Sequence, residues 1–451
     1  MTVTTEAPIP AGTPLLGSML DLKRDALGTF LRARETHGDV VKFLAGPPGL
    51  RRTMYGLFSA EAAQQVLATE SANFRKDNYF YEVLRSTFGN GLLTSQDDTY
   101  MRQRRLIQPL FTPRGIRAYD TAITGEAAAT AEGWRGQDVV DVAEEMERFT
   151  LRAVARILFG ADIDTAVPAV RRFFPEISET SLRRAYGAGI VKPTWPTPRN
   201  RRFDSACEEL YAVCDTLIAE RRAADEPGGD LLGLLIKART EDGETLSPDE
   251  IRDQVLVFLL AGHETTSTSL TFALHLLGRN PDAQKRMHEE IDAVLTEGRP
   301  PQAGDLDRMP YTERVIKEAM RLYPAAAATG RQAVADTEVD GVHIPAGSDV
   351  TVSAYVTHRD PAYWPDPMRF DPDRFLPEAE QSRHRYAWMP FGGGPRACIG
   401  AQFAMLESVL GLAVLLQAYE VEAVDDREIA TAFGITMRPA EPVRLRLTPR
   451  S

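Results

Sequence analysis

The chain has 451 residues, of which 43% are hydrophobic and 26% are charged, a balance typical of a globular protein with a sizeable core. Its formal net charge of −12 argues against general nucleic-acid binding, its three cysteines cannot all pair, and its N-terminus has no signal-peptide pattern. No apolar run approaches the roughly 20 residues that span a bilayer, so we expect a cytoplasmic protein without a membrane anchor.

Strand signals occupy two parts of a chain in which helical periodicity otherwise dominates. Residues 39–58 contain the runs DVVKFLAG and RRTMYGLF. Residues 337–356 contain further strand-like runs, and Asp340-Gly341 within them is typical of a two-residue hairpin turn. We find no internal repeat and no clear domain boundary, so we predict one domain over residues 1–451, mainly α with minor β.

A breaker-rich segment at residues 186–202, YGAGIVKPTWPTPRNRR, separates two helical stretches. Helical patterns resume on both sides of it without a change in composition. We therefore interpret it as a mobile connection inside the domain rather than as a linker between domains.

The longest predicted helix begins at Ser247. This serine, Pro248 at the first helical position and Glu250 form a capping box. The apolar pattern ends at Asn280 and Pro281, which gives about 30 residues and a length of roughly 45 Å. Such a helix must cross the whole domain.

The middle of this helix reads AGHETTSTS, residues 261–269. A glycine and five Ser/Thr residues weaken a helix interior and invite hydrogen bonds from side chains to the backbone. A polar stripe that faces solvent would also explain them. The flanks, however, are strongly apolar, and a polar break in a helix that crosses the core is typical of a functional site.

The loop FGGGPRACIG, residues 391–400, surrounds Cys398 with four glycines, a proline and an arginine. Apolar residues recur after the cysteine with helical spacing, so Cys398 lies at or just before a helix N-terminus, where free N–H groups favour a thiolate. The glycines let the backbone approach a flat object closely. We interpret Cys398 as a metal-binding thiolate, and Cys207 and Cys214 as small buried hydrophobes.

Five positions of this loop carry a resemblance to a known family. Phe391, Gly394, Arg396, Cys398 and Gly400 fit the pattern F-x-x-G-x-R-x-C-x-G, so the chain resembles the cytochrome P450 haem-thiolate monooxygenases. The resemblance implies haem b, with iron bound by the Cys398 thiolate and with Phe391, Gly394 and Arg396 as further cofactor-binding residues. It also implies the fold of this family, in which the long central helix crosses over the haem.

Two residues of the central helix become the expected catalytic pair. Residues 261–266 look like the oxygen-activation motif of the family. By this resemblance Thr265 donates a hydrogen bond during oxygen activation, and Glu264 relays protons from solvent. Gly262 would leave room for oxygen and substrate.

Two further motifs extend the resemblance over most of the chain. Glu318 and Arg321, followed by LYP, look like the E-x-x-R pair of the family, and Arg374 in FDPDRF looks like the arginine that joins it. Other Glu-x-x-Arg copies in the chain fit ordinary helix pairs. The implied role of the three residues is structural, through charge-assisted hydrogen bonds.

The resemblance also implies partners for the two haem propionates, which need cations inside a protein. Arg104, Arg331 and Arg396 are the expected partners, and His358 is a further candidate. Tyr100 stands four residues before Arg104, where the family usually has tryptophan or histidine, and it can still offer a hydroxyl.

The substrate pocket is expected from four parts of the chain, again by resemblance. Its predicted residues are Tyr79, Phe80, Val83, Leu84, Val257, Ala261, Ala325, Ala326, Thr329 and Ile435. Four consecutive alanines at 325–328 leave room above the haem. We expect a mainly apolar substrate, such as a terpenoid, polyketide or cyclic peptide, and the segment at 186–202 stands where the family has its access lid.

The implied activity is insertion of one oxygen atom from O2 into a small molecule, by hydroxylation, epoxidation or oxidative coupling, in bacterial specialised metabolism. The sequence shows no Gly-rich dinucleotide fingerprint after a strand, so the electrons come from outside. A ferredoxin or flavodoxin with an NAD(P)H-dependent reductase is the expected partner, and we expect a monomer.

Other functions remain open at this point. A haem-binding sensor or carrier would use cysteine ligation without turnover. A peroxide-driven peroxygenase would not need a proton relay, and an isomerase or dehydratase would not need dioxygen. The presence of both Glu264 and Thr265 argues against the peroxygenase and the isomerase or dehydratase.

Overall fold

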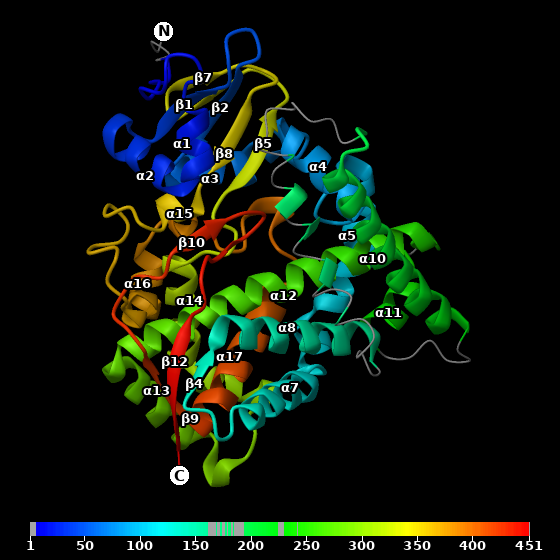
Figure 1. The fold of residues 1–451 in the computed structure, drawn as a ribbon, viewed down its shortest axis with the longest axis vertical. Helices are drawn as coiled ribbons and strands as arrows, with labels where there is room; N and C mark the ends of the chain where they lie inside the picture. Colours follow the sequence, from blue (N-terminus) through cyan, green and yellow to red (C-terminus); the bar gives the residue numbers. More distant parts are fainter. Residues whose placement is uncertain are drawn as a thin grey trace.

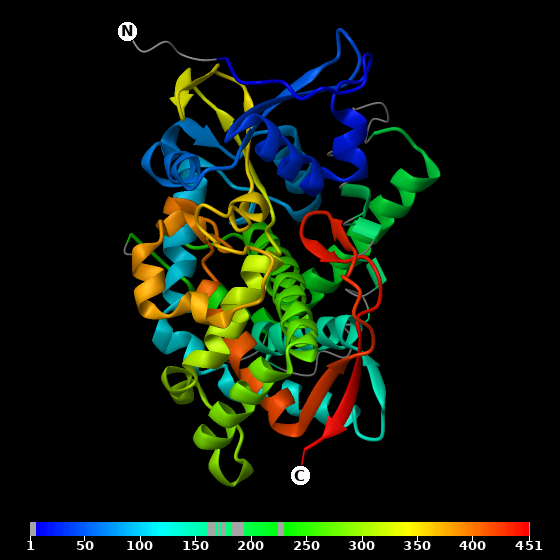
Figure 2. The same ribbon diagram turned by 90° about the vertical axis from the view of Figure 1, so that its left-hand side faces the viewer.

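The computed structural model describes residues 6–160, 194–223, 230–240 and 242–450, with a few separate residues between 161 and 193. Sheets lie at both ends of the molecule and long helices fill its middle (Figure 1). The first helices and strands lie at one end and the last strand at the other in both views (Figures 1 and 2). Of the predicted connection at 186–202, residues 186–193 fall outside the described residues, and a helix begins at Pro198.

Helices make up most of the described chain. They are α1 (Met19–Arg24), α2 (Ala26–His37), α3 (Ala60–Gln64), α4 (Tyr79–Phe88), α5 (Asp97–Ile107), α6 (Pro113–Arg117), α7 (Asp120–Gly133), α8 (Val142–Phe159), α10 (Pro198–Ala223), α11 (Leu231–Lys237), α12 (Pro248–Arg279), α13 (Pro281–Val294), α14 (Pro310–Leu322), α15 (Ala354–Thr357), α16 (Pro377–Ser382) and α17 (Ala401–Ala418).

The strands are short. They are β1 (Val40–Ala45), β2 (Arg52–Leu57), β3 (Phe74–Arg75), β4 (Val139–Asp141), β5 (Thr329–Ala333), β6 (Thr337–Val339), β7 (Val342–Ile344), β8 (Asp349–Val352), β9 (Tyr419–Ala423), β10 (Thr431–Phe433), β11 (Met437–Pro439) and β12 (Arg444–Pro449). The prediction of a mainly helical chain with minor β structure is confirmed.

The largest sheet has the order β1-β2-β8-β5-β3, in which β2 and β8 are parallel and the other pairs are antiparallel. A separate hairpin joins β6 to β7 through Asp340 and Gly341, whose φ angles are 47° and 77°. Positive φ at both central residues is what the predicted two-residue turn requires. The sequence signals missed the strands of the β4-β12-β9 sheet.

Helix α12 begins as its capping box predicts. Ser247 Oγ accepts a hydrogen bond from the Glu250 amide at 3.2 Å, and the Glu250 carboxylate accepts one from the Ser247 amide at 2.9 Å. The expected break at 261–269 does not occur, because the helix runs without interruption to Arg279. Thr265 Oγ1 instead donates a hydrogen bond to the Ala261 carbonyl at 2.7 Å. The hydroxyl group therefore finds a partner on the backbone without interrupting the helix.

Close packing of helices explains Gly262. A Cβ atom at this position would lie 3.0 Å from the Val154 side chain of α8. The expectation that Gly262 chiefly leaves room for oxygen and substrate is therefore incomplete, since the missing side chain also lets α8 and α12 approach. Apolar residues of α12 belong to two separate buried clusters, so this helix divides the core.

Helix α17 forms another part of the core beside α12. It is the one helix among the described residues that is long and apolar enough to cross a membrane by length and composition. Two thirds of it, 67%, is buried inside the molecule, as in the core helix of a globular protein.

The Glu318–Arg321 pair on α14 is fully buried. Arg321 donates to the two carboxylate oxygens of Glu318 at 2.6 and 2.7 Å, and Arg374 Nε lies 3.4 Å from the same carboxylate. Arg321 also donates to the carbonyl oxygens of His358 and Pro367 at 2.9 and 2.7 Å. One buried guanidinium thus holds α14 against two loop segments.

We predict that Arg321→Met lowers the free energy of unfolding by about 3–5 kcal/mol, because it leaves the Glu318 carboxylate buried without its main partner. The matched control is Arg446→Met, which removes an exposed pair with Glu422 on the β9–β12 sheet and should cost at most about 1 kcal/mol. Urea unfolding followed by circular dichroism measures both variants. Equal losses in the two variants would contradict a special role for the buried pair.

A second buried carboxyl lies between α12 and α17. Glu407 is fully buried, and neither of its side-chain oxygens has a fully formed hydrogen bond among the described residues, although Thr266 lies beside it. Burial raises the pKa of Glu407 to about 8, and the neighbouring Thr266 hydroxyl opposes this rise only in part. Glu407 is therefore neutral in the folded protein near pH 7.

This carboxyl should make the stability of the protein depend on pH. The pKa of Glu407 rises from its ordinary value of 4.5 to about 8 on folding, so its contribution is full below pH 4.5 and is lost as the pH rises towards 8. We predict that Glu407→Gln removes this dependence, which amounts to at most about 1.4 kcal/mol per pH unit. Thermal midpoints between about pH 5 and pH 8 measure it, with the exposed Glu289→Gln as control. Parallel curves for wild type and Glu407→Gln would refute the prediction.

Candidate active site

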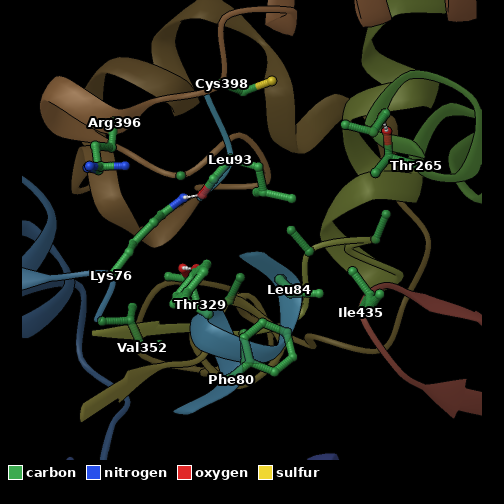
Figure 3. Close-up of a pocket in the computed structure, with 18 of the residues that line it drawn as sticks. Lys76, Phe80, Leu84, Leu93, Thr265, Thr329, Val352, Arg396, Cys398 and Ile435 are labelled. Atoms are coloured by element: carbon green, nitrogen blue, oxygen red, sulfur yellow. Dashed lines mark hydrogen bonds between the residues drawn. The ribbon is translucent and has the colours of Figure 1, made fainter. Parts of the chain in front are cut away.

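The loop before α17 positions the Cys398 thiol. A 3₁₀ turn over Gly394–Arg396 precedes the cysteine, and the Cys398 amide donates to the Phe391 carbonyl at 2.9 Å. The thiol is surrounded by protein and exposed to an internal cavity (Figure 3). Burial raises the pKa of Cys398, while the Gly400 amide and the charges of Arg104 and Lys76 lower it. As predicted, the cysteine stands just before a helix, since α17 begins at Ala401.

The glycines of this loop serve the packing of the chain on itself. A Cβ atom at Gly393 would lie 2.3 Å from the Tyr386 ring. One at Gly394, where φ is +62°, would lie 1.9 Å from the Leu67 carbonyl oxygen. Gly394 does not line the cavity and its close contact is with main chain, so its assignment as a cofactor-binding residue stays a prediction. Phe391 does line the cavity.

The cavity beside Cys398 has a volume of about 560 Å³. Figure 3 shows Cys398 and Thr265 on one side of it and Phe80 and Val352 on the opposite side. The predicted pocket residues that line it are Tyr79, Phe80, Leu84, Val257, Ala261, Ala325, Ala326, Thr329 and Ile435. Val83 is the exception, since it is buried on α4 without lining the cavity.

Two of the predicted arginines are tied to the cysteine loop and to α5. Arg396 donates to the Ser95 carbonyl at 2.6 Å, and its guanidinium lies 3.9 Å from the centre of the Tyr100 ring. Arg104 donates to Tyr100 Oη and to the Ala397 carbonyl, both at 2.9 Å. Tyr100 Oη in turn donates to the Pro395 carbonyl at 2.9 Å, so its hydroxyl is already engaged.

Arg331 and Lys76 complete a group of four cations with Arg104 and Arg396, while a fifth cation that lines the cavity, Arg52, comes from strand β2. Arg331 donates to Thr329 Oγ1 at 2.9 Å and to the Gly330 carbonyl at 2.7 Å. Lys76, which the sequence analysis missed, donates to the Leu93 carbonyl at 3.3 Å (Figure 3). Burial, together with the charges of the neighbouring arginines, lowers the pKa of Lys76 to about 8. No local motif marks this lysine, because the arginines beside it come from distant segments of the chain.

These residues fit a haem with its two propionates. Arg396 Nη1 is buried and has no hydrogen-bond partner among the described residues, so it is available to an anionic group. Asp349 is the one acidic side chain among the described residues that line the cavity, so the four cations lack matching carboxylates. A thiol and an unbalanced cationic group beside one cavity suit an iron porphyrin with two carboxylates.

His358 does not belong to this group, which corrects its assignment as a propionate partner. It does not line the cavity, and its Nε2 accepts a hydrogen bond from the Met389 amide at 2.9 Å. Burial lowers the pKa of His358 to about 3, so the imidazole is neutral and cannot balance a carboxylate. Its contact instead holds the chain that leads to the cysteine loop.

The two predicted catalytic residues face different surroundings. Thr265 lines the cavity, whereas Glu264 does not. Burial raises the pKa of Glu264, and the neighbouring Thr436 side chain and the charge of Arg438 oppose this rise only in part. Glu264 Oε2 has no hydrogen-bond partner in the part of the chain that the structure describes.

The sequence is similar to those of known oxygenases. Cyclooctatin synthase of Streptomyces melanosporofaciens is 38% identical over 444 residues, which cover 98% of this chain and 95% of that protein. Cyclooctat-9-en-7-ol 5-monooxygenase of the same species is 36% identical over 422 residues, covering 93% and 90%. Pentalenene oxygenase of Streptomyces avermitilis is 35% identical over 443 residues, covering 98% and 97%.

The fold and the family model agree with these similarities. The crystal structure of the cytochrome P450DA heme domain superposes with a TM-score of 0.90 at 28% identity, covering 100% of this chain and 99% of that one. The family model for cytochrome P450 matches residues 7–446. The chain therefore belongs to the cytochrome P450 family, and it is a haem b monooxygenase that uses O2, a small-molecule substrate and an external redox partner.

Proposed function

We propose that the protein hydroxylates a terpenoid in bacterial specialised metabolism. The observation that carries the proposal is the apolar wall of the cavity, in which small alanines, 325, 326 and 328, leave space and Phe80 and Leu84 add apolar surface. Such a surface suits a bulky hydrocarbon skeleton that makes few hydrogen bonds. The names of the relatives at 35–38% identity, cyclooctatin synthase, cyclooctat-9-en-7-ol 5-monooxygenase and pentalenene oxygenase, support this substrate class.

The cations and the cysteine would hold the cofactor. Cys398 would bind the iron as a thiolate, and Arg104, Arg331, Arg396 and Lys76 would bind the propionates. When bound, haem supplies the activation of dioxygen and the transfer of one oxygen atom. The apolar side chains around the cavity exclude water and orient the substrate.

Thr265 and Glu264 would supply protons to the cavity. Thr265 lines the cavity, and its Oγ1, which donates to the Ala261 carbonyl, can present its hydroxyl there after a rotation about χ1. Burial raises the pKa of Glu264, which favours the protonated form of this carboxyl at the preceding position of the helix. A proton given up by Thr265 would be replaced from Glu264, which does not itself line the cavity.

The electrons would come from a ferredoxin or a flavodoxin with an NAD(P)H-dependent reductase. The external redox partner that the family uses supports this pairing. We place the protein in the cytoplasm, where such small carriers and NAD(P)H are available.

A ligand screen followed by turnover tests the proposed function. Terpenes and terpene alcohols should shift the haem absorption of the purified holoenzyme, and surrogate ferredoxin, reductase and NADPH should convert the binding compounds into products heavier by one oxygen atom. Mass spectrometry with ¹⁸O₂ identifies the source of that atom. Ligand binding without any product under varied redox partners would instead favour a sensor or carrier.

The same assay yields a prediction for Thr265→Ala. The variant should fold and bind haem, with a stability change of no more than about 1 kcal/mol, because alanine favours helix. Loss of the hydroxyl should divert most of the NADPH consumed from hydroxylated product to hydrogen peroxide. Ser269→Ala is the matched control, since it removes a hydroxyl one helical turn away that also lines the cavity. Wild-type coupling in Thr265→Ala would refute the proton relay.

A further inference from the structure

The outer end of the cavity is formed by one face of the five-stranded sheet. Arg52 and Met54 alternate along β2, Asp349 and Thr351 alternate along β8, and Met54 pairs with Asp349 in parallel register. The alternation along each strand and the register between the strands place these four residues on one face of the sheet, and all four line the cavity. The outer end therefore carries a guanidinium and a carboxylate side by side.

Tyr79, at the start of α4, closes this end against Arg52. The guanidinium carbon of Arg52 lies 4.4 Å from the centre of the Tyr79 ring. Arg52 is exposed, whereas Tyr79 is partly buried. The two side chains therefore bound this end of the cavity through a cation–π contact.

A second cavity of about 470 Å³ adjoins the first at this point. Arg52, Tyr79 and Asp349 line both cavities, and Asp77 and Glu82 line only the second. Asp77 lies 3.8 Å from Arg75 and 3.7 Å from Arg85, so its charge is balanced there. Asp349 and Glu82 remain as two carboxylates that share the boundary with the one guanidinium of Arg52. This excess of negative charge disfavours a carboxylate or phosphate group on the ligand.

One carboxylate oxygen of Asp349 can accept a further hydrogen bond. Its Oδ1 is buried and has no partner among the described residues, while Gln332 bonds to its carboxylate. Burial raises the pKa of Asp349, and the charge of Arg52 lowers it. A buried acceptor that lacks a donor is costly unless a bound group supplies one.

A hydroxyl group matches these surroundings better than other groups. It can donate to Asp349 and accept from Arg52, whereas a hydrocarbon leaves both groups without a new partner. We propose that the outer end of the cavity binds a hydroxyl group of the substrate, so that the protein acts on a terpenoid alcohol in preference to the parent hydrocarbon or the corresponding acid. This hydroxyl subsite rests on the proposed terpenoid hydroxylation.

If the substrate is an alcohol, its hydroxyl group also indicates which class of reaction must precede this one. A substrate that already carries a hydroxyl must come from an earlier hydroxylation or from a cyclisation that ends with addition of water. Anchoring that hydroxyl at the sheet directs the opposite part of the skeleton towards Cys398 and Thr265, which lie on the other side of the cavity (Figure 3). The product would then be a diol.

Matched ligand series test the hydroxyl subsite by binding alone. The probes are two series of hydrocarbon, alcohol and acid on a shared skeleton: abietadiene, abietadienol and abietic acid, and khusimene, khusimol and zizanoic acid. Dissociation constants come from the haem absorption change of the holoenzyme. In at least one series the alcohol should bind about tenfold more tightly than the hydrocarbon and the acid.

Two variants should remove this preference. Arg52→Met and Asp349→Asn remove one charge each with little change in side-chain size, and each should reduce the preference for the alcohol over the hydrocarbon to less than about threefold. Arg51→Met is the matched control, since Arg51 is exposed, bonds to the Pro14 carbonyl and does not line the cavity. Haem content and the carbon monoxide difference spectrum show that each variant is folded.

These binding measurements distinguish a failure of the hydroxyl subsite from a failure of the proposed terpenoid hydroxylation. Tighter binding of either hydrocarbon or acid by the wild type, or an unchanged preference in both variants, would overturn the hydroxyl subsite while terpenoid binding stands. No spectral change with any of these compounds would overturn the terpenoid assignment, and the hydroxyl subsite with it.

Discussion

Four cations beside one thiol are the constraint on which the site depends. Lys76, Arg104, Arg331 and Arg396 line one cavity, and burial together with the like charges of Arg331 and Arg396 lowers the pKa of Lys76. Anionic propionates would relieve this repulsion, so binding of the cofactor and local stability are coupled. The same cations fix the cysteine loop, because Arg104 bonds to the carbonyl of the residue before Cys398.

Behind the cysteine loop, a second set of buried polar groups makes the frame rigid. Arg321 binds Glu318 and two carbonyl groups, including that of His358, while the His358 imidazole accepts from the Met389 amide. These bonds link α14 to the chain that leads into the loop. The rest of the cavity lining is mainly apolar, apart from Arg52 and Asp349 at the outer end, so the polar bonds that hold the thiol in place are concentrated around the cysteine loop.

Local sequence patterns were sufficient for some of these features and insufficient for others. The loop around Cys398 and the cap at Ser247 depend on neighbouring residues, and the structure has both as predicted. Lys76 and Glu407 were missed because their surroundings come from segments far away in the chain. His358 was misassigned because a sequence does not show which way a buried imidazole faces.

The two ends of the cavity are built by different elements of the fold. The reactive end is built by α12 and the cysteine loop, whereas the polar outer end is built by β2 and β8. Arg52 and Asp349 are far apart in the sequence, so only the parallel pairing of these strands brings them to one face. Substitutions there would change the orientation of a substrate without disturbing the cations or the thiol. Chemistry and substrate recognition therefore depend on separate elements of the same fold.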